Sequence, residues 1–204
     1  NLLDPVAPLF KKADIAFFNL EGPIVDGGNS VKCGASAGKT CFAFRMPTHY
    51  AKYIKDAGLD VVSVANNHAN DFGDRGREST RNALDKFGIK HAGSDKEKFA
   101  IAFLDVKGKK VAVVAFATNS ITPNVNDLDF AKQIVEKAVR QSDIVMVSFH
   151  GGAEGAANAR VPNRTETFLG EQRGAFDRGA AAGRQPAPIR EHAQIPTRGF
   201  FFRQ

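Results

Sequence analysis

Five short runs of apolar residues are spaced along the first 150 residues, and most are rich in β-branched or aromatic side chains. Near-continuous apolar runs of this length are typical of strands that are buried on both faces. The sequence therefore predicts five strands, over residues 13–20, 60–65, 99–106, 111–118 and 144–149. The segment Lys107-Gly108-Lys109-Lys110 separates the third run from the fourth, which predicts a hairpin with a solvated tip.

Between these runs the apolar positions recur with the spacing of helices. Helices are predicted over residues 49–57, 77–87 and 128–139, and the third of them gathers its apolar residues on one stripe. Gly58 and Gly88 follow the first two helices and are typical helix ends. Strands that alternate with helices in this way predict an α/β fold with a mostly parallel sheet.

The character of the sequence changes after about residue 170. Lysine disappears, and glycine, alanine, proline and arginine replace the amphipathic pattern. We therefore predict one domain over residues 1–169 and an atypical tail over residues 170–204. We hypothesise that the sequence from about residue 174 is out of its native reading frame, with a disordered linker as the alternative. The opening residues contain no signal peptide, which predicts that the chain starts inside a longer protein.

The net charge of the chain excludes few classes of function. The net charge is +6 at pH 7, and half of it lies in residues 170–204. A basic balance can indicate an anionic polymer as partner, but a solvated tail explains it as well. Because the chain has two Tyr, no Trp and no interleaving of basic and aromatic residues, we expect no nucleic-acid partner. The longest apolar run, Val111–Ala117, is too short to span a bilayer, so no transmembrane segment is expected.

Two cysteines lie eight positions apart in a segment rich in glycine, serine and lysine. Cys33 and Cys41 match neither a CxxC motif nor the spacing of a zinc site. A disulfide between them would indicate an oxidising compartment. The sequence leaves this pairing and two free thiols open as alternatives.

Polar side chains follow three of the predicted strands at the point where each strand ends. The clusters span Asn19–Gly22, Ala65–Gly73 and Ser148–Gly155. In open α/β sheets, binding sites form outside the carboxyl ends of the strands. This placement therefore predicts that the three clusters share one site.

Each cluster contains residue types that bind divalent metals. Glu21 carries a carboxylate beyond an apolar run, where it must be exposed, paired or bound to a metal; a helix cap or turn is the alternative. Asn67, His68 and Asp71 carry groups that suit Mn, Fe or Zn, although Asn and Asp also favour ordinary turns. His150 precedes a glycine-rich turn, and in company with the other clusters it favours a metal site over a structural role.

These clusters, in this order, resemble the CapA family of poly-γ-glutamate capsule biosynthesis proteins, which is grouped with the calcineurin-like metallophosphoesterases. The most specific match is the Asn-Asn-His-x-x-Asp-x-Gly motif at residues 66–73. Supporting matches lie at residues 13–21, 44–47, 57–65 and 150–154. The resemblance implies a four-layer α/β/β/α sandwich, incomplete in this chain, with a site for two divalent metal ions (Mn, Fe, Zn or Mg) at the strand ends.

The resemblance also implies roles for individual residues. Glu21, Asn67 and His150 correspond to metal ligands, and His68 corresponds to the general acid. Asp71 matches a family position beside this histidine and is assigned to the catalytic group. Further candidate site residues are Asn19, Asn66 and Glu154. The family's Gly-Asp motif on the first strand and its Gly-His-x-x-His motif near the C-terminus are not in this sequence, so the chain is expected to lack ligands from both ends.

Two functions follow from the resemblance. The first, expected of the complete protein, is metal-dependent hydrolysis or transfer at a phosphoester or related anionic substrate during capsule biosynthesis. The second is a non-catalytic role, in which the protein binds or anchors an anionic polymer of the cell envelope within a capsule biosynthesis complex. Because family members are usually exported or membrane-anchored, the resemblance implies an extracytoplasmic or membrane-associated location.

Overall fold

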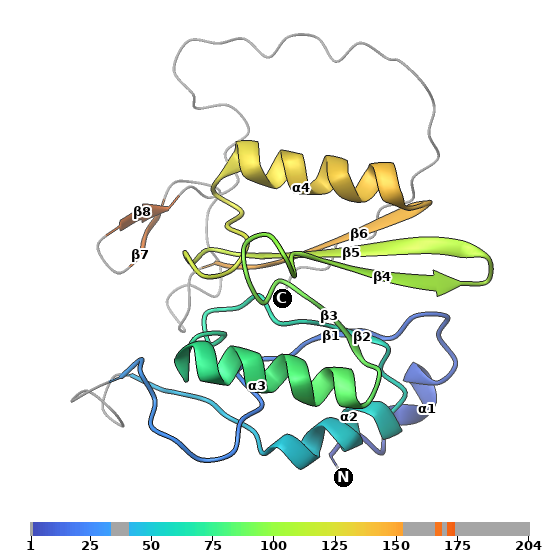
Figure 1. Cartoon of the computed structure of the whole chain (residues 1–204), viewed down its shortest axis with the longest axis horizontal. Coiled ribbons are helices and arrows are strands. Elements are labelled where there is room, and N and C mark those ends of the chain that lie inside the picture. Colours follow the sequence, from blue (N-terminus) through green and yellow to red (C-terminus); the bar gives the residue numbers. More distant parts are fainter. Residues whose placement is uncertain (1, 34–40, 153–165, 169–170, 174–204) are drawn as a thin grey trace, which may run out of the picture. The chain divides into compact units, whose positions relative to one another are not determined.

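Two three-stranded sheets face each other in the computed structural model of this chain, which describes residues 2–33, 41–152, 166–168 and 171–173 (Figure 1). The first sheet is entirely parallel and has the order β1-β2-β3, with strands Phe17–Asn19, Val61–Ser63 and Lys90–Ala92. The second has the order β4-β5-β6, with strands Ile101–Val106, Lys109–Ala117 and Ile144–His150. In it, β4 and β5 form an antiparallel hairpin, whereas β5 and β6 are parallel.

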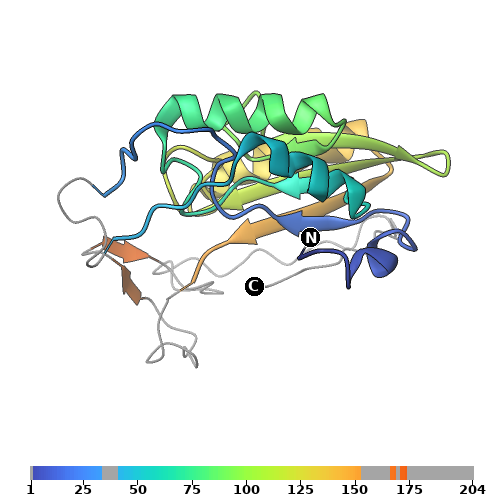
Figure 2. The same ribbon diagram turned by 90° about the horizontal axis from the view of Figure 1, so that it is seen from below.

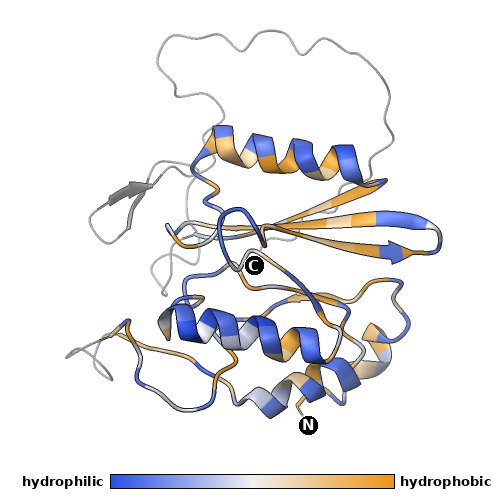
Figure 3. Ribbon diagram, viewed as in Figure 1, coloured by the Kyte–Doolittle hydropathy of each residue, from blue (hydrophilic) through white to orange (hydrophobic). Residues whose placement is uncertain are grey.

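Helices cover the outer face of each sheet (Figures 1 and 3). On the first sheet these are the 3-10 turn η2 and the helices α2 and α3, with bounds Thr48–Tyr50, Ala51–Asp56 and Gly73–Lys86. Helix α4 (Leu128–Gln141) packs on the second sheet, and the short helix α1 (Ala7–Phe10) lies near the N-terminus. The apolar face of α4 is turned toward the sheet, as Figure 3 shows, and its N-terminus is capped by Asp127, which accepts the Phe130 N–H.

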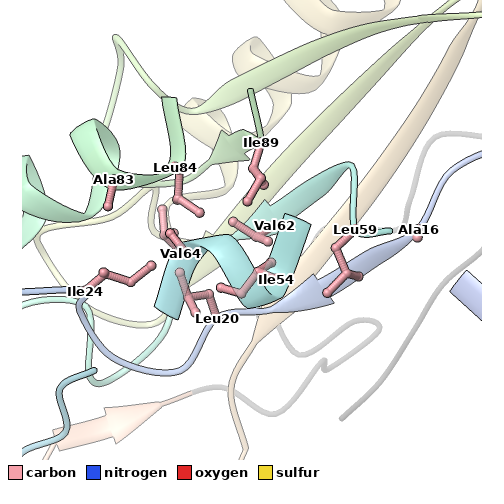
Figure 4. Packing of buried hydrophobic residues seen from close by; sticks show 11 residues of the cluster. Ala16, Leu20, Ile24, Ile54, Leu59, Val62, Val64, Ala83, Leu84 and Ile89 are labelled. Carbon is pink, nitrogen blue, oxygen red and sulfur yellow. The ribbon is translucent and has the colours of Figure 1, made fainter. Parts of the chain in front are cut away.

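Three clusters of buried hydrophobic residues separate four layers of secondary structure. The cluster between the first sheet and its helices includes Leu20, Ile54, Val62 and Leu84 (Figure 4). A second cluster of small residues, among them Val61, Ala92, Val113 and Ala115, joins the two sheets. The third lies between the second sheet and α4 and includes Val114, Ile134 and Ala138. The arrangement is therefore helix, sheet, sheet, helix, which confirms the α/β/β/α sandwich that the resemblance implied.

The chain divides into two units, with the boundary after His150. All the elements above belong to the first unit. In the second unit the structure describes one antiparallel hairpin, made of β7 (Glu166–Phe168) and β8 (Glu171–Arg173). The proposed change of reading frame from about residue 174 lies outside the described residues.

Predicted elements that rest on long apolar patterns are confirmed, whereas those that rest on short patterns differ from the elements in the structure. The hairpin at residues 107–110 is confirmed, and Lys107 at its tip is exposed and paired with Asp14. The strand expected over residues 13–20 is only three residues long, and the N–H of Ala16 before it donates to the Asp60 carboxylate. Strand β6 is partly exposed along its length, so the expectation of burial on both faces is wrong there.

Strand β3 was not predicted, because its three residues show no apolar period. Its central residue, His91, is buried and pairs with Val62 of β2. Burial lowers the pKa of His91, and the nearby Asp85 carboxylate opposes this shift. His91 therefore acts as a neutral core residue at pH 7. Among the described residues, no helix is long and apolar enough to cross a membrane.

Candidate metal centre

The carboxyl ends of three strands bring together the three predicted metal ligands. Glu21 follows β1, Asn67 follows β2, and His150 is the last residue of β6. Figure 2 shows that β1 and β6 run toward the same side of the molecule. Nε2 of His150 lies 3.1 Å from Oδ1 of Asn67, and its Nδ1 lies 3.8 Å from Oε2 of Glu21. An imidazole, an amide and a carboxylate from two different sheets therefore converge on one place.

The amides of Asn19 and Asn66 hold the ends of β1 and β2 together. Nδ2 of Asn66 donates to Oδ1 of Asn19 at 3.2 Å and to the Leu20 carbonyl at 2.8 Å. Oδ1 of Asn66 accepts the backbone N–H of His68 at 3.1 Å, and Nδ2 of Asn19 donates to Glu21 at 2.5 Å. Since every polar atom of these two amides is engaged, Asn19 and Asn66 position the loop and the Glu21 carboxylate.

His68 and Asp71 form a buried pair next to this site. Nδ1 of His68 lies 2.6 Å from Oδ2 of Asp71, and the same oxygen accepts the Phe44 N–H at 2.6 Å. The Phe44 ring stacks on the imidazole, with ring centroids 3.9 Å apart. Because an ionised carboxylate only accepts hydrogen bonds, Nδ1 of His68 carries the proton in this contact. Nε2 is then the nitrogen through which His68 can exchange a proton with a bound molecule.

Lys32 adds a positive charge to the pair. Its ammonium lies 3.2 Å from Oδ1 of Asp71, donates to the Asn67 carbonyl at 3.3 Å, and lies 3.1 Å from Nδ1 of His68. Since Nδ1 already bears a proton toward Asp71, the ion pair with Asp71 is the contact that fixes Lys32. The Asp71 side chain is almost fully buried, so its charge is balanced by His68 and Lys32 rather than by solvent.

Cys33, the next residue, forms a disulfide with Cys41. This settles the alternative that the sequence left open, and these are the only two cysteines of the chain. The bond joins the segment that carries Lys32 to the segment that carries Phe44. Both segments thus reach the His68–Asp71 pair.

Sequence reasoning missed three residues of this region. Lys32 lies in a segment with no recognisable pattern, and Phe44 was matched to the family without a role. Asn119 donates to the Asn66 carbonyl at 3.0 Å and supports the loop after β2. It follows the predicted strand over residues 111–118, so the rule that found the other three clusters could have found it. Glu154 lies outside the described residues.

The donors present suit part of a divalent-metal site. Glu21 supplies a carboxylate oxygen, Asn67 an amide oxygen and His150 an imidazole nitrogen, which are ligand types for Mn, Fe and Zn. Among the residues that the structure describes, no three His, Cys, Asp or Glu side chains form a metal-binding group, since the third donor here is an amide. A complete coordination shell needs four or more donors, so further ligands or water would have to join these three.

Comparisons with known proteins relate the chain to capsule biosynthesis proteins. The chain is 27% identical over 169 residues to the PGA biosynthesis protein CapA of Bacillus subtilis, covering 76% of this chain and 43% of that protein. It is 24% identical over 168 residues to the capsule biosynthesis protein CapA of Bacillus anthracis, covering 73% and 40%. The chain thus spans less than half the length of these curated relatives. A crystal structure of a hypothetical protein from Thermus thermophilus has a TM-score of 0.46 and 16% identity, over 76% of this chain and 54% of that one.

The family model described as bacterial capsule synthesis protein PGA_cap matches residues 1–171, which is most of the chain and includes every described site residue. This match and the two CapA relatives confirm the resemblance to the CapA family that the motif at residues 66–73 indicated. This chain belongs to the PGA_cap family of bacterial capsule synthesis proteins.

Proposed function

We propose that this chain carries part of a site for two divalent metal ions that hydrolyses or transfers a phosphoester or related anionic group during capsule biosynthesis. The observation that carries the proposal is the convergence of Glu21, Asn67 and His150 from three strand ends, beside the His68–Asp71 pair. Three potential ligands and a paired histidine on adjacent loops are a combination that packing alone does not require.

In this proposal each side chain has a separate task. Glu21, Asn67 and His150 hold the ions, for which Mn, Fe, Zn and Mg are the candidates. When bound, such ions polarise an anionic oxygen and supply a nucleophile at neutral pH. Asp71 keeps the proton of His68 on Nδ1 and stabilises the imidazolium, so that His68 can give a proton from Nε2 to the leaving oxygen.

The experiment is hydrolysis of bis(4-nitrophenyl) phosphate by the complete protein that carries this site, loaded with Mn²⁺. We expect hydrolysis that Mn²⁺ stimulates and EDTA removes. Because altering even a group behind a metal ligand costs about 10–100-fold in activity, Glu21→Gln is expected to lose at least about 100-fold. Glu97→Gln, which changes an exposed carboxylate, is the matched control and should keep the full rate. Hydrolysis that is insensitive to EDTA, or equal in Glu21→Gln and the unaltered protein, would overturn the proposal.

A second function is supported by the net charge of +6. In that alternative the protein binds an anionic polymer at the cell envelope, as part of a capsule biosynthesis complex, without cleaving it. Binding through bulk charge weakens steeply as salt rises, because mobile ions screen exposed charges. Salt-sensitive binding of poly-γ-glutamate, together with no metal-stimulated hydrolysis, would favour this alternative over the enzyme.

A further inference from the structure

We propose that the Cys33–Cys41 disulfide is a redox control of the candidate site: it holds two chain segments against Asp71 and His68, and its reduction releases them. For its activity readout the inference rests on the proposed function. We define the first arm as residues 30–33 and the second arm as residues 41–46. Both arms contact the same pair of side chains, and the disulfide joins them.

The first arm binds Asp71 through its backbone and its charge. The Ser30 hydroxyl and the Val31 N–H both donate to the Asp71 carbonyl, at 2.8 Å and 2.9 Å. The Lys32 ammonium then reaches the Asp71 carboxylate at 3.2 Å. Cys33 comes directly after Lys32, so the crosslink lies one residue from the cation that balances Asp71.

The second arm binds the other side of the pair. The Phe44 N–H donates to Oδ2 of Asp71, the oxygen that also contacts His68, and the Phe44 ring stacks on the imidazole. Further along, Met46 pairs with Pro23 and Val25 through its backbone, which fixes the far end of this arm independently of Asp71. The orientation of His68 therefore depends on Phe44, which lies between that fixed end and the crosslink at Cys41.

Apart from the contacts already described, the second arm is held through Arg45, which donates to the Gly28 carbonyl at 3.1 Å and lies over the Phe72 ring. The Lys32 side chain is 31% exposed and Phe44 is 44% exposed, so neither is anchored by deep burial. Contacts made by partly exposed groups open readily unless the chain is tethered. The crosslink shortens the connection between the two arms and so raises the fraction of time for which both contact the pair.

The disulfide is reduced by thiol–disulfide exchange. A dithiol reductant gives two electrons and two protons to the disulfide, which becomes two cysteine thiols, and the reductant becomes a cyclic disulfide. In the reduced protein Lys32 and Phe44 are expected to leave Asp71 more often, and His68 loses its fixed orientation. Reduction also loosens the contact of Lys32 with the Asn67 carbonyl, but the Asn67 and Glu21 side chains lie against His150 rather than against the arms, so we expect the metal ligands to move less than His68.

The test compares the oxidised protein with the protein reduced by dithiothreitol, using amide hydrogen exchange. We expect the Phe44 amide to exchange at least about tenfold faster after reduction. The Met46 amide, in the same arm but bonded to Pro23, is the internal control and should change little. Cys33→Ser/Cys41→Ser should reproduce the reduced state without reductant and should not respond to it.

Rates measured on two esters distinguish a loss of His68 positioning from a general loss of structure. Loss of an oriented proton donor slows esters with poor leaving groups most. Reduction should therefore slow diphenyl phosphate more than bis(4-nitrophenyl) phosphate in the Mn²⁺-loaded protein. Unchanged Phe44 exchange, or equal acceleration of the Phe44, Met46 and Val62 amides, would overturn the inference. If the oxidised protein hydrolyses neither ester, the proposed function fails, while the exchange result still decides whether the disulfide holds the arms.

Discussion

Replacing His68 by asparagine is expected to slow the hydrolysis of diphenyl phosphate by the Mn²⁺-loaded protein about 10²–10⁴-fold, the usual contribution of a positioned general acid. The reason lies in the contact between Nδ1 of His68 and Asp71, which leaves Nε2 to protonate the departing oxygen. Asparagine keeps a polar side chain in the buried loop but cannot donate a titrating proton. The backbone N–H of residue 68 would still bond to Asn66, so the loop itself should persist.

The leaving group provides the internal check on this result. Because 4-nitrophenolate leaves without protonation, His68→Asn should slow bis(4-nitrophenyl) phosphate far less than diphenyl phosphate. His49→Asn, which alters an exposed histidine near α2, is the control and should leave both rates unchanged. An equal loss on both esters would mean that His68 supports the structure and does not donate a proton. Full activity on diphenyl phosphate would remove His68 from the mechanism.

Gly93→Ala is expected to lower the free energy of unfolding by about 2–5 kcal/mol, the sum of a positive-φ penalty and an overpacking penalty. Gly93 follows β3 and has a φ of +91°. A Cβ there would lie 2.5 Å from the Cβ of Ala65 and 3.0 Å from the Ala115 carbonyl oxygen. Ala65 follows β2 and Ala115 lies in β5, so the added methyl group would push the two sheets apart next to the candidate site.

Gly108→Ala separates the positive-φ penalty from the overpacking penalty in the free energy of unfolding. Gly108 has a φ of +75° in the β4–β5 hairpin, and a Cβ there would meet no atom of the described residues within 4 Å beyond its two chain neighbours. It should therefore lose only the conformational part, about 1–2 kcal/mol. Urea unfolding of both variants, followed by circular dichroism, measures the difference. Equal losses in Gly93→Ala and Gly108→Ala would show that the space between the sheets is not as tight as these distances require.

The parts of the fold that sequence reasoning predicts well are those with long, regular patterns. The hairpin around Gly108, the buried strand β2 and the amphipathic helix α4 all follow from apolar spacing. Strand β3 does not, because three residues cannot display a period, and its position is set by pairing with β2. The facing of two sheets came from the family resemblance and could not be read from the spacing of the strands.

The residues of the candidate site also fall into two groups, those that could be predicted from the sequence and those that could not. Glu21, Asn67 and His150 could be placed together because strand ends in an α/β fold share one edge, and local motifs mark each end. Lys32 and Phe44 could not, since they approach Asp71 from 39 and 27 positions away in the sequence and depend on a crosslink that the sequence left undecided. Asn66, expected among the site residues, uses its amide to join β1 and β2.

Mn²⁺ binding to the protein, followed by the electron paramagnetic resonance signal of free Mn²⁺, tests the central claim most directly. The unaltered protein should remove Mn²⁺ from solution, His150→Ala should bind at least about tenfold more weakly, and His49→Ala should bind normally. That pattern would assign the ion to the place where His150 meets Asn67 and Glu21. Equal binding by His150→Ala and the unaltered protein, or no binding by either, would contradict the assignment of these three residues as metal ligands.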